Sequence, residues 1–218
     1  MDSFTQLIRG TGSVAEVIAI YDEHCTTYEK MVCEKGKYKG PFILVEAVTK
    51  EVPECRRKEV RVLDVAAGTG MVGVALAQKG FTNLDALEPS EGMLECLRSK
   101  NVYTNTFHEY IGQGHTNVPQ GCYDLVFAVG GMGYNHIPFT GVLEFVRFAK
   151  PGGLVMICMR HDEEDYLTKL KEYMNRLEEQ QLWKKEFSTP IKDFLIGTEG
   201  VTPGRQKLCG VGGGLLVF

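Results

Sequence analysis

The stretch Val62-Leu63-Asp64-Val65-Ala66-Ala67-Gly68-Thr69-Gly70 decides the fold of this 218-residue chain. It begins with an apolar, β-branched run that starts near Val60 and is typical of a buried strand. The glycines that follow predict a tight turn, and residues 71–79 continue with helical spacing until Gly80. A strand, a glycine turn and a helix in this order are the first unit of an α/β fold.

The same alternation continues towards the carboxyl end of the chain. Further strands are expected at 83–87, 102–107, 123–129, 154–159, 183–189 and 215–218, and helices at 90–100, 138–149 and 162–181. Strands that alternate with helices form a parallel sheet with right-handed crossovers. The sequence therefore predicts a doubly wound, mainly parallel, seven-stranded sheet with one antiparallel strand.

Two helices are expected before the first strand. Ser13-Val14-Ala15-Glu16 has the pattern of a capping box, which predicts a helix from there to about residue 32. Pro41 is well placed in the first turn of a second helix that ends near residue 52. We expect a single domain over residues 1–218, with N-terminal helices (1–55) that act as a lid on an α/β core (56–218).

Composition and charge argue against several classes of partner. The net charge is −4 and the isoelectric point near 5.8, so a broad basic surface for nucleic acid is not expected. The short basic run Arg56-Arg57-Lys58 is interpreted as a solvated linker, with a small local basic patch as the alternative. No apolar segment approaches 18 residues, which predicts no membrane span and no secretory signal.

The cysteines and histidines show no metal-binding spacing. The seven cysteines form no C-x-x-C pair and their number is odd, which favours reduced thiols in an intracellular protein. We expect a cytoplasmic location, with the nucleus left open. His24, His108 and His115 do not combine into a ligand set, so no metal is predicted.

The glycine turn also matches another pattern. Gly68 to Gly73 read G-x-G-x-x-G, as in loops that bind a dinucleotide. Asp64 ends the first strand, where its charge would repel a diphosphate but suits the ammonium group of a methionine-derived ligand. Glu88 ends the next strand and can accept hydrogen bonds from both ribose hydroxyls, as either cofactor would require. After it, Ser90 caps a helix and Met93 offers an apolar wall beside an adenine.

In this combination the motifs resemble those of class I S-adenosylmethionine-dependent methyltransferases. The stretch 64–70 is similar to the acid-x-x-x-Gly-x-Gly motif of that family, with Ala66 where many members have glycine. Residues 88–94, 123–127 and 148–153 are similar to three further motifs in the expected order, over about residues 14–160. The resemblance implies a Rossmann-like methyltransferase fold, S-adenosyl-L-methionine as cofactor and S-adenosyl-L-homocysteine as product.

The ligand of such a fold lies at the carboxyl ends of the strands, near the point where strand order reverses. From the N-terminal helix, Tyr28 is expected to contact the ligand, on the same helical face as Tyr21, with a pair of core aromatics as the alternative. Tyr38 is a further candidate for the lid. The predicted cofactor-binding residues are Tyr28, Asp64, Ala66, Gly68, Gly70, Met71, Glu88, Pro89, Ser90, Met93, Tyr110, Ile111, Val129 and Gly130.

Methyl transfer from a sulfonium is an in-line displacement that depends mainly on alignment. A base is needed only if the nucleophile carries a proton of high pKa. His136 and His161 follow the fourth and fifth strands and are candidates for such a base, with a structural role as the alternative for each. The acceptor is expected to be a small molecule or a protein side chain, and a monomer is plausible.

Two other functions are considered. One is a module that binds the cofactor without turnover and acts through partners. The other is an NAD-dependent oxidoreductase, which Asp64 and the Ser90-x-x-Met93 step disfavour. An Asn/Asp-Pro-Pro-aromatic tetrapeptide is absent after the fourth strand, which disfavours methylation of a nucleobase amine.

Overall fold

The computed structural model describes residues 12–35, 38–160, 164–187, 205–207 and 213–217. Its strands are β1 (Arg61–Val65), β2 (Asn83–Leu87), β3 (Asn105–Phe107), β4 (Tyr123–Val129), β5 (Ala149–Cys158), β6 (Lys184–Phe187), β7 (Arg205–Lys207) and β8 (Gly213–Val217). Its α-helices are α2 (Val14–His24), α3 (Tyr28–Lys30), α4 (Gly40–Glu51), α5 (Met71–Gln78), α6 (Glu91–Ser99), α7 (Val142–Phe148) and α8 (Glu164–Glu179).

The strands form one sheet in the order β3-β2-β1-β4-β5-β8-β6-β7. The five strands from β3 to β5 pair in parallel, and β8 runs parallel to both β5 and β6. Strand order reverses between β1 and β4. The fold is thus an α/β, Rossmann-like fold with a parallel sheet, as the alternation of strands and helices predicts.

The edge of the sheet differs from the prediction. Within the described residues the sheet has eight strands rather than seven, because Arg205–Lys207 forms β7. That polar tripeptide has no apolar alternation, so nothing in the sequence marks it as a strand. Antiparallel pairing occurs between β6 and β7.

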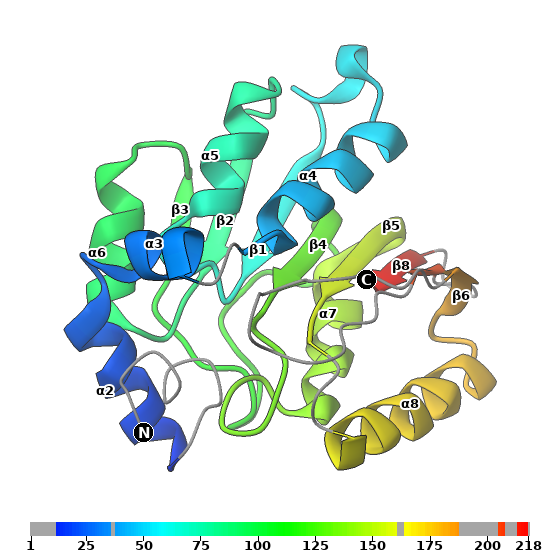
Figure 1. Ribbon diagram of the computed structural model, residues 1–218. Helices are drawn as coiled ribbons and strands as arrows, with labels where there is room; N and C mark the ends of the chain where they lie inside the picture. Colours follow the sequence, from blue (N-terminus) through cyan, green and yellow to red (C-terminus); the bar gives the residue numbers. More distant parts are fainter. Residues whose placement is uncertain (1–11, 36–37, 161–163, 188–204, 208–212, 218) are drawn as a thin grey trace.

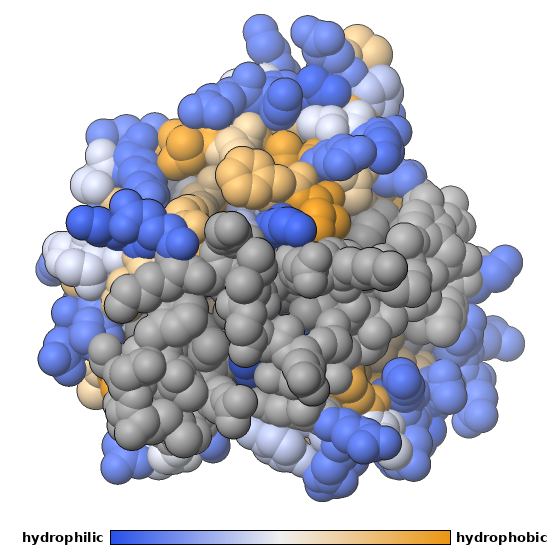
Figure 2. All heavy atoms as spheres, viewed as in Figure 1, coloured by the Kyte–Doolittle hydropathy of each residue, from blue (hydrophilic) through white to orange (hydrophobic). Residues whose placement is uncertain are grey.

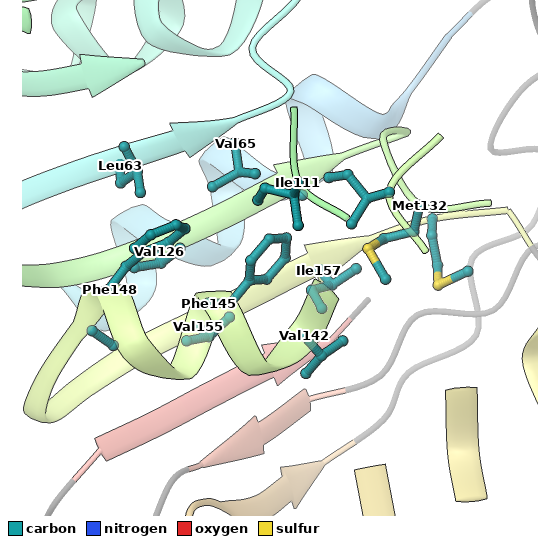
Figure 3. Close-up of a cluster of buried hydrophobic side chains, with 14 of the residues drawn as sticks. Leu63, Val65, Ile111, Val126, Met132, Val142, Phe145, Phe148, Val155 and Ile157 are labelled. Carbon is teal, nitrogen blue, oxygen red and sulfur yellow. The ribbon is translucent and has the colours of Figure 1, made fainter. Parts of the chain in front are cut away.

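Helices cover both faces of the sheet (Figure 1), with α4 and α5 on one side and α7 and α8 on the other. The strands alternate accordingly, since Val62 packs with α4 and α5 whereas Leu63 packs with α7. Figure 3 shows the second of these cores, in which Phe145 and Phe148 of α7 lie against side chains of β1, β4 and β5. Burial on both faces explains why the central strands are almost continuously apolar.

Several local predictions hold and others are wrong. Ser13 and Glu16 form the predicted capping box of α2, but the helix ends at His24 rather than near residue 32. The break coincides with Thr27, whose backbone N–H and side-chain hydroxyl both donate to the His24 carbonyl in place of helical bonding. After Pro138 the chain first forms a 3₁₀ turn at Phe139–Gly141, and the α-helix begins only at Val142.

A buried network joins the strands away from the glycine turn. The Oδ2 atom of Asp85 accepts hydrogen bonds from Arg61 Nη2 (2.7 Å) and from the Tyr123 hydroxyl (3.0 Å). Asp85 is 2% exposed, so the guanidinium group beside it balances the cost of burying its carboxylate. The network has a purely structural role and serves below as a reference for the tyrosine–aspartate pair of the site.

Among the helices of the described ranges, none is long and apolar enough to cross a membrane.

Candidate functional site

Two adjoining cavities lie at the carboxyl ends of β1 and β4. The larger cavity, of about 680 Å³ with its open mouth, is lined by Val17, Ile18, Tyr21, Tyr28, Ala66, Gly68, Leu87, Glu88, Pro89, Ser90, Met93, Tyr110, Ile111, Val129, Gly130, Gly131, Asn135, His136 and Ile137. The smaller, of about 350 Å³, is lined by Tyr28, Tyr38, Pro41, Asp64, Ala66, Ala67, Gly68, Thr69, Met71, Val72 and Val129. Both share the start of the glycine turn, so together they form one elongated site.

The predicted cofactor residues meet at these cavities, with one exception. All of them except Gly70 line one cavity or the other. Gly70 instead caps α5 with a φ of +83°, a left-handed conformation that favours glycine. Its contribution is therefore to the turn from β1 into α5.

Glu88 ties the two cofactor loops together. Its Oε2 atom accepts from the Gly68 N–H (2.7 Å) and its Oε1 atom from the Ser90 N–H (2.9 Å). Burial raises the pKa of Glu88 to about 7, although both backbone hydrogen bonds work in the opposite direction. Each oxygen keeps a second lone pair that can accept from a ribose hydroxyl in the larger cavity.

Asp64 lines the smaller cavity, whereas Glu88 lines the larger one. Asp64 is 3% exposed, and its Oδ2 atom accepts a hydrogen bond from the Tyr103 hydroxyl (2.7 Å). Burial raises the pKa of Asp64 to about 8, and the nearby charge of Glu88 adds to the rise. Since a cation beside it would favour the ionised form, the residue fits an ammonium group.

Two carboxylates fasten the N-terminal helices to these same loops. At the carboxyl end of α2, Asp22 Oδ1 accepts from the Ser90 hydroxyl (2.6 Å) and from the Gly92 N–H (2.9 Å). On α3, Glu29 accepts from the Thr69 hydroxyl (2.7 Å) and pairs with Lys100. We call α2 and α3 the covering helices, because residues of both line the larger cavity.

His136 and Tyr21 form a hydrogen-bonded pair on the wall of the larger cavity. The Nδ1 atom of His136 lies 3.0 Å from the Tyr134 carbonyl oxygen, which can only accept, so Nδ1 carries the proton. Its Nε2 atom then accepts from the Tyr21 hydroxyl at 2.9 Å. Burial lowers the pKa of His136, so the imidazole is neutral near pH 7.

Tyr21 and Tyr28 lie on two separate helices rather than on one face of a single helix. Both nevertheless line the larger cavity, and their ring centroids are 6.0 Å apart. Tyr28 thus lies at the cavity, but on α3 rather than on a helix that continues from α2.

Hydrophobic residues gather over the start of α4 (Figure 2), where Phe42 is 69% exposed beside Pro41.

Sequence reasoning missed some lining residues. Val17 and Ile18 on α2, with Asn135 and Ile137 after β4, carry no motif that marks them. His161 lies outside the described residues. The described part of the chain contains no group of three or more His, Cys, Asp or Glu residues that could hold a metal.

Comparisons with known proteins agree with this geometry. Residues 62–153 match a family model described as a methyltransferase domain. Human methyltransferase-like protein 27 is 29% identical over 184 residues, which cover 84% of this chain and 74% of that protein. A demethylmenaquinone methyltransferase of Clavibacter sepedonicus is 36% identical over 100 residues, 45% of this chain and 40% of that protein.

Among solved structures, an S-adenosyl-L-methionine-dependent methyltransferase of Methanococcus maripaludis superposes with a TM-score of 0.54 at 15% identity, covering 89% of this chain and 92% of that one. At this identity the likeness shows a shared fold.

Proposed function

We propose that this chain transfers a methyl group from S-adenosylmethionine to a small molecule or a protein side chain. The match of residues 62–153 to a methyltransferase domain supports this proposal. The observation that carries the proposal is the pair of adjoining cavities with one buried carboxylate in the lining of each. Asp64 suits the ammonium group of the methionine part, and Glu88 suits the ribose hydroxyls. The apolar wall of Pro89, Met93 and Ile111 suits the adenine.

The cofactor supplies a methyl group activated on a sulfonium sulfur, and the chain supplies alignment. The new bond forms between the acceptor and the methyl carbon while the carbon–sulfur bond breaks. Residues Val17, Ile18 and Ile137 would exclude water on the acceptor side of the larger cavity. A proton lost by the acceptor can pass to His136 Nε2 through the Tyr21 hydroxyl, or to solvent.

Within this class we also propose kinship with the methyltransferase-like protein encoded in the Williams–Beuren syndrome region. The dipeptides Gly80-Phe81, Pro89-Ser90 and Lys150-Pro151 support this kinship. The kinship does not identify a methyl acceptor. The residues 1–55 are proposed as a lid, in keeping with the position of the covering helices. We place the protein in the cytoplasm, with the nucleus as an alternative.

Calorimetry with S-adenosylmethionine, S-adenosylhomocysteine and NAD tests the cofactor. We expect both sulfur ligands to bind and NAD not to bind. Binding of NAD alone would overturn the proposal. The variant Glu88→Ala should bind the sulfur ligands more weakly by about 1–3 kcal/mol, because it loses charged hydrogen bonds.

Transfer of a labelled methyl group into a cell extract tests turnover and identifies the acceptor. The extract is separated into small molecules, RNA and protein, and Glu88→Ala serves as the control. We expect label in the small-molecule or protein fraction with the wild type and much less with the variant. Tight cofactor binding without label in any fraction would favour the module that binds without turnover.

A further inference from the structure

Tyr103 reaches the site from outside the two cavities. It lies in the loop before β3, and its hydroxyl donates to Asp64 Oδ2 at 2.7 Å. Neither cavity is lined by Tyr103, so it does not touch a ligand bound in them. Any effect of Tyr103 on the ligand must therefore pass through Asp64.

The chain makes room for this tyrosine at two glycines of the helix that follows the turn. A Cβ atom on Gly73 would lie 2.1 Å from the Tyr103 hydroxyl oxygen, and one on Gly70 would lie 3.0 Å from the ring. The third glycine of the G-x-G-x-x-G pattern thus has a packing role, because it makes room for the Tyr103 side chain.

Asp64 is left with one oxygen for a ligand. No described residue donates a hydrogen bond to its Oδ1 atom, and the side chain lines the smaller cavity. A buried carboxylate oxygen without a donor costs free energy, which a cation in the cavity would recover. Tyr103 and Glu88 lie near it, and among the described residues that line the smaller cavity none has a cationic side chain.

We propose that Tyr103 is a positioning residue, which holds Asp64 through Oδ2 so that Oδ1 receives the ammonium group of the methionine part of the cofactor. The proposal rests on the proposed function. Burial and Asp64 both raise the pKa of Tyr103, so its hydroxyl keeps the proton that it donates. The hydrogen bond from Tyr103 also lowers the pKa of Asp64 against the effect of burial, which favours the charged form.

The variant Tyr103→Phe tests this role, with Tyr123→Phe as the matched control. Both changes remove one hydroxyl that donates to a buried aspartate, but the Tyr123–Asp85 pair lies outside both cavities. Affinity is measured by calorimetry for S-adenosylhomocysteine and for 5′-methylthioadenosine, which keeps the adenosine but lacks the ammonium and carboxylate groups. Unfolding temperatures show whether both variants fold.

We expect Tyr103→Phe to weaken S-adenosylhomocysteine binding by roughly 10-fold or more, and to change 5′-methylthioadenosine binding by less than about 2-fold. Tyr123→Phe should change neither affinity. In an Asp64→Asn background, Tyr103→Phe should have little further effect, because the two side chains act as a unit.

Three results would overturn the proposal: unchanged S-adenosylhomocysteine binding in Tyr103→Phe, an equal loss for both ligands, or a loss that adds in full to that of Asp64→Asn. These differ from a failure of the proposed function. In that case the wild type itself would bind neither ligand.

Discussion

At the scale of single residues, Ala66 shows the conformational demand of the turn after β1. Its φ is +55°, in the left-handed region, where a Cβ atom costs roughly 1–2 kcal/mol. Many members of the methyltransferase family that the motif resembles have glycine at this position. The left-handed backbone explains that preference, because glycine adopts it without strain. Gly131 allows the alanine, because a Cβ there would lie 2.7 Å from the Ala66 Cβ.

Ala66→Gly is therefore expected to leave stability unchanged or to raise the free energy of unfolding by up to about 1 kcal/mol, since relief of strain exceeds or offsets the added backbone entropy. Ala67→Gly is the control, because Ala67 has no positive φ and should lose about 0.4–1 kcal/mol. Urea unfolding monitored by circular dichroism measures both. A larger loss for Ala66→Gly than for Ala67→Gly would show that the left-handed conformation carries no strain.

At the scale of elements, α2 is held on the core by its last turn. Asp22 receives two donors from the start of α6, and Gly92 permits the approach, since a Cβ there would lie 3.0 Å from the Asp22 carbonyl oxygen. Tyr21 adds a hydrogen bond to His136, and Val17, 2% exposed, adds apolar burial.

Asp22→Ala should loosen α2 without unfolding the core. Loss of the two hydrogen bonds is expected to destabilise the docking by about 1–3 kcal/mol. Hydrogen exchange followed by mass spectrometry should show faster exchange in residues 14–24 and unchanged exchange in β1 and β4. Glu23→Ala, at the neighbouring exposed position, is the control. Equal exchange in the two variants would mean that the remaining contacts of α2, those of Tyr21 and Val17, hold the helix without Asp22.

Local and distant contacts differ in how well the sequence predicts them. The capping box at Ser13, the cap at Ser90 and the stop at Gly80 were all predicted, because each signal lies within a few residues. The pair Tyr103–Asp64 spans 39 residues and the pair Asp22–Ser90 spans 68, and no local pattern reports such contacts.

The same reason limits the candidate site. The part of the site formed by the loops after β1 and β2 could be predicted, because the motif residues cluster where strand order reverses. The part formed by the covering helices depends on how α2 packs on the core, which no motif reports. Tyr28 was expected on a continuous helix, yet Thr27 diverts the chain before it. The extra edge strand β7 escaped prediction because a polar tripeptide becomes a strand only through pairing with β6.

At the scale of the whole molecule, two buried carboxylates make the stability of the ligand-free protein depend on pH. Burial raises the pKa of Asp64 to about 8 and that of Glu88 to about 7. A carboxyl group whose pKa is higher in the folded state than in the unfolded state stabilises the folded protein at low pH. This stabilisation is complete below the unfolded-state pKa, near 4, and it is lost as the pH rises through the folded-state pKa. His136 acts in the opposite sense, because its lowered pKa reduces stability only below about pH 6.5.

The unfolding temperature of the ligand-free protein should therefore fall from about pH 6.5 to about pH 8.5, a window in which His136 stays neutral. Asp64→Asn should flatten that fall, because an amide cannot ionise. Scanning fluorimetry at several pH values gives both curves. Parallel curves for the wild type and Asp64→Asn would contradict the assigned cost of ionising Asp64.

The hydrogen bonds of Asp22 and Glu29 have a consequence for residence time. They join the covering helices to the loops that carry Ser90 and Thr69, which line the floor of the two cavities. We therefore expect the dissociation of a molecule bound beneath them to depend on how readily α2 and α3 lift from these loops. Compounds of equal affinity can then differ widely in how long they stay, according to whether they strengthen or break those two carboxylate contacts.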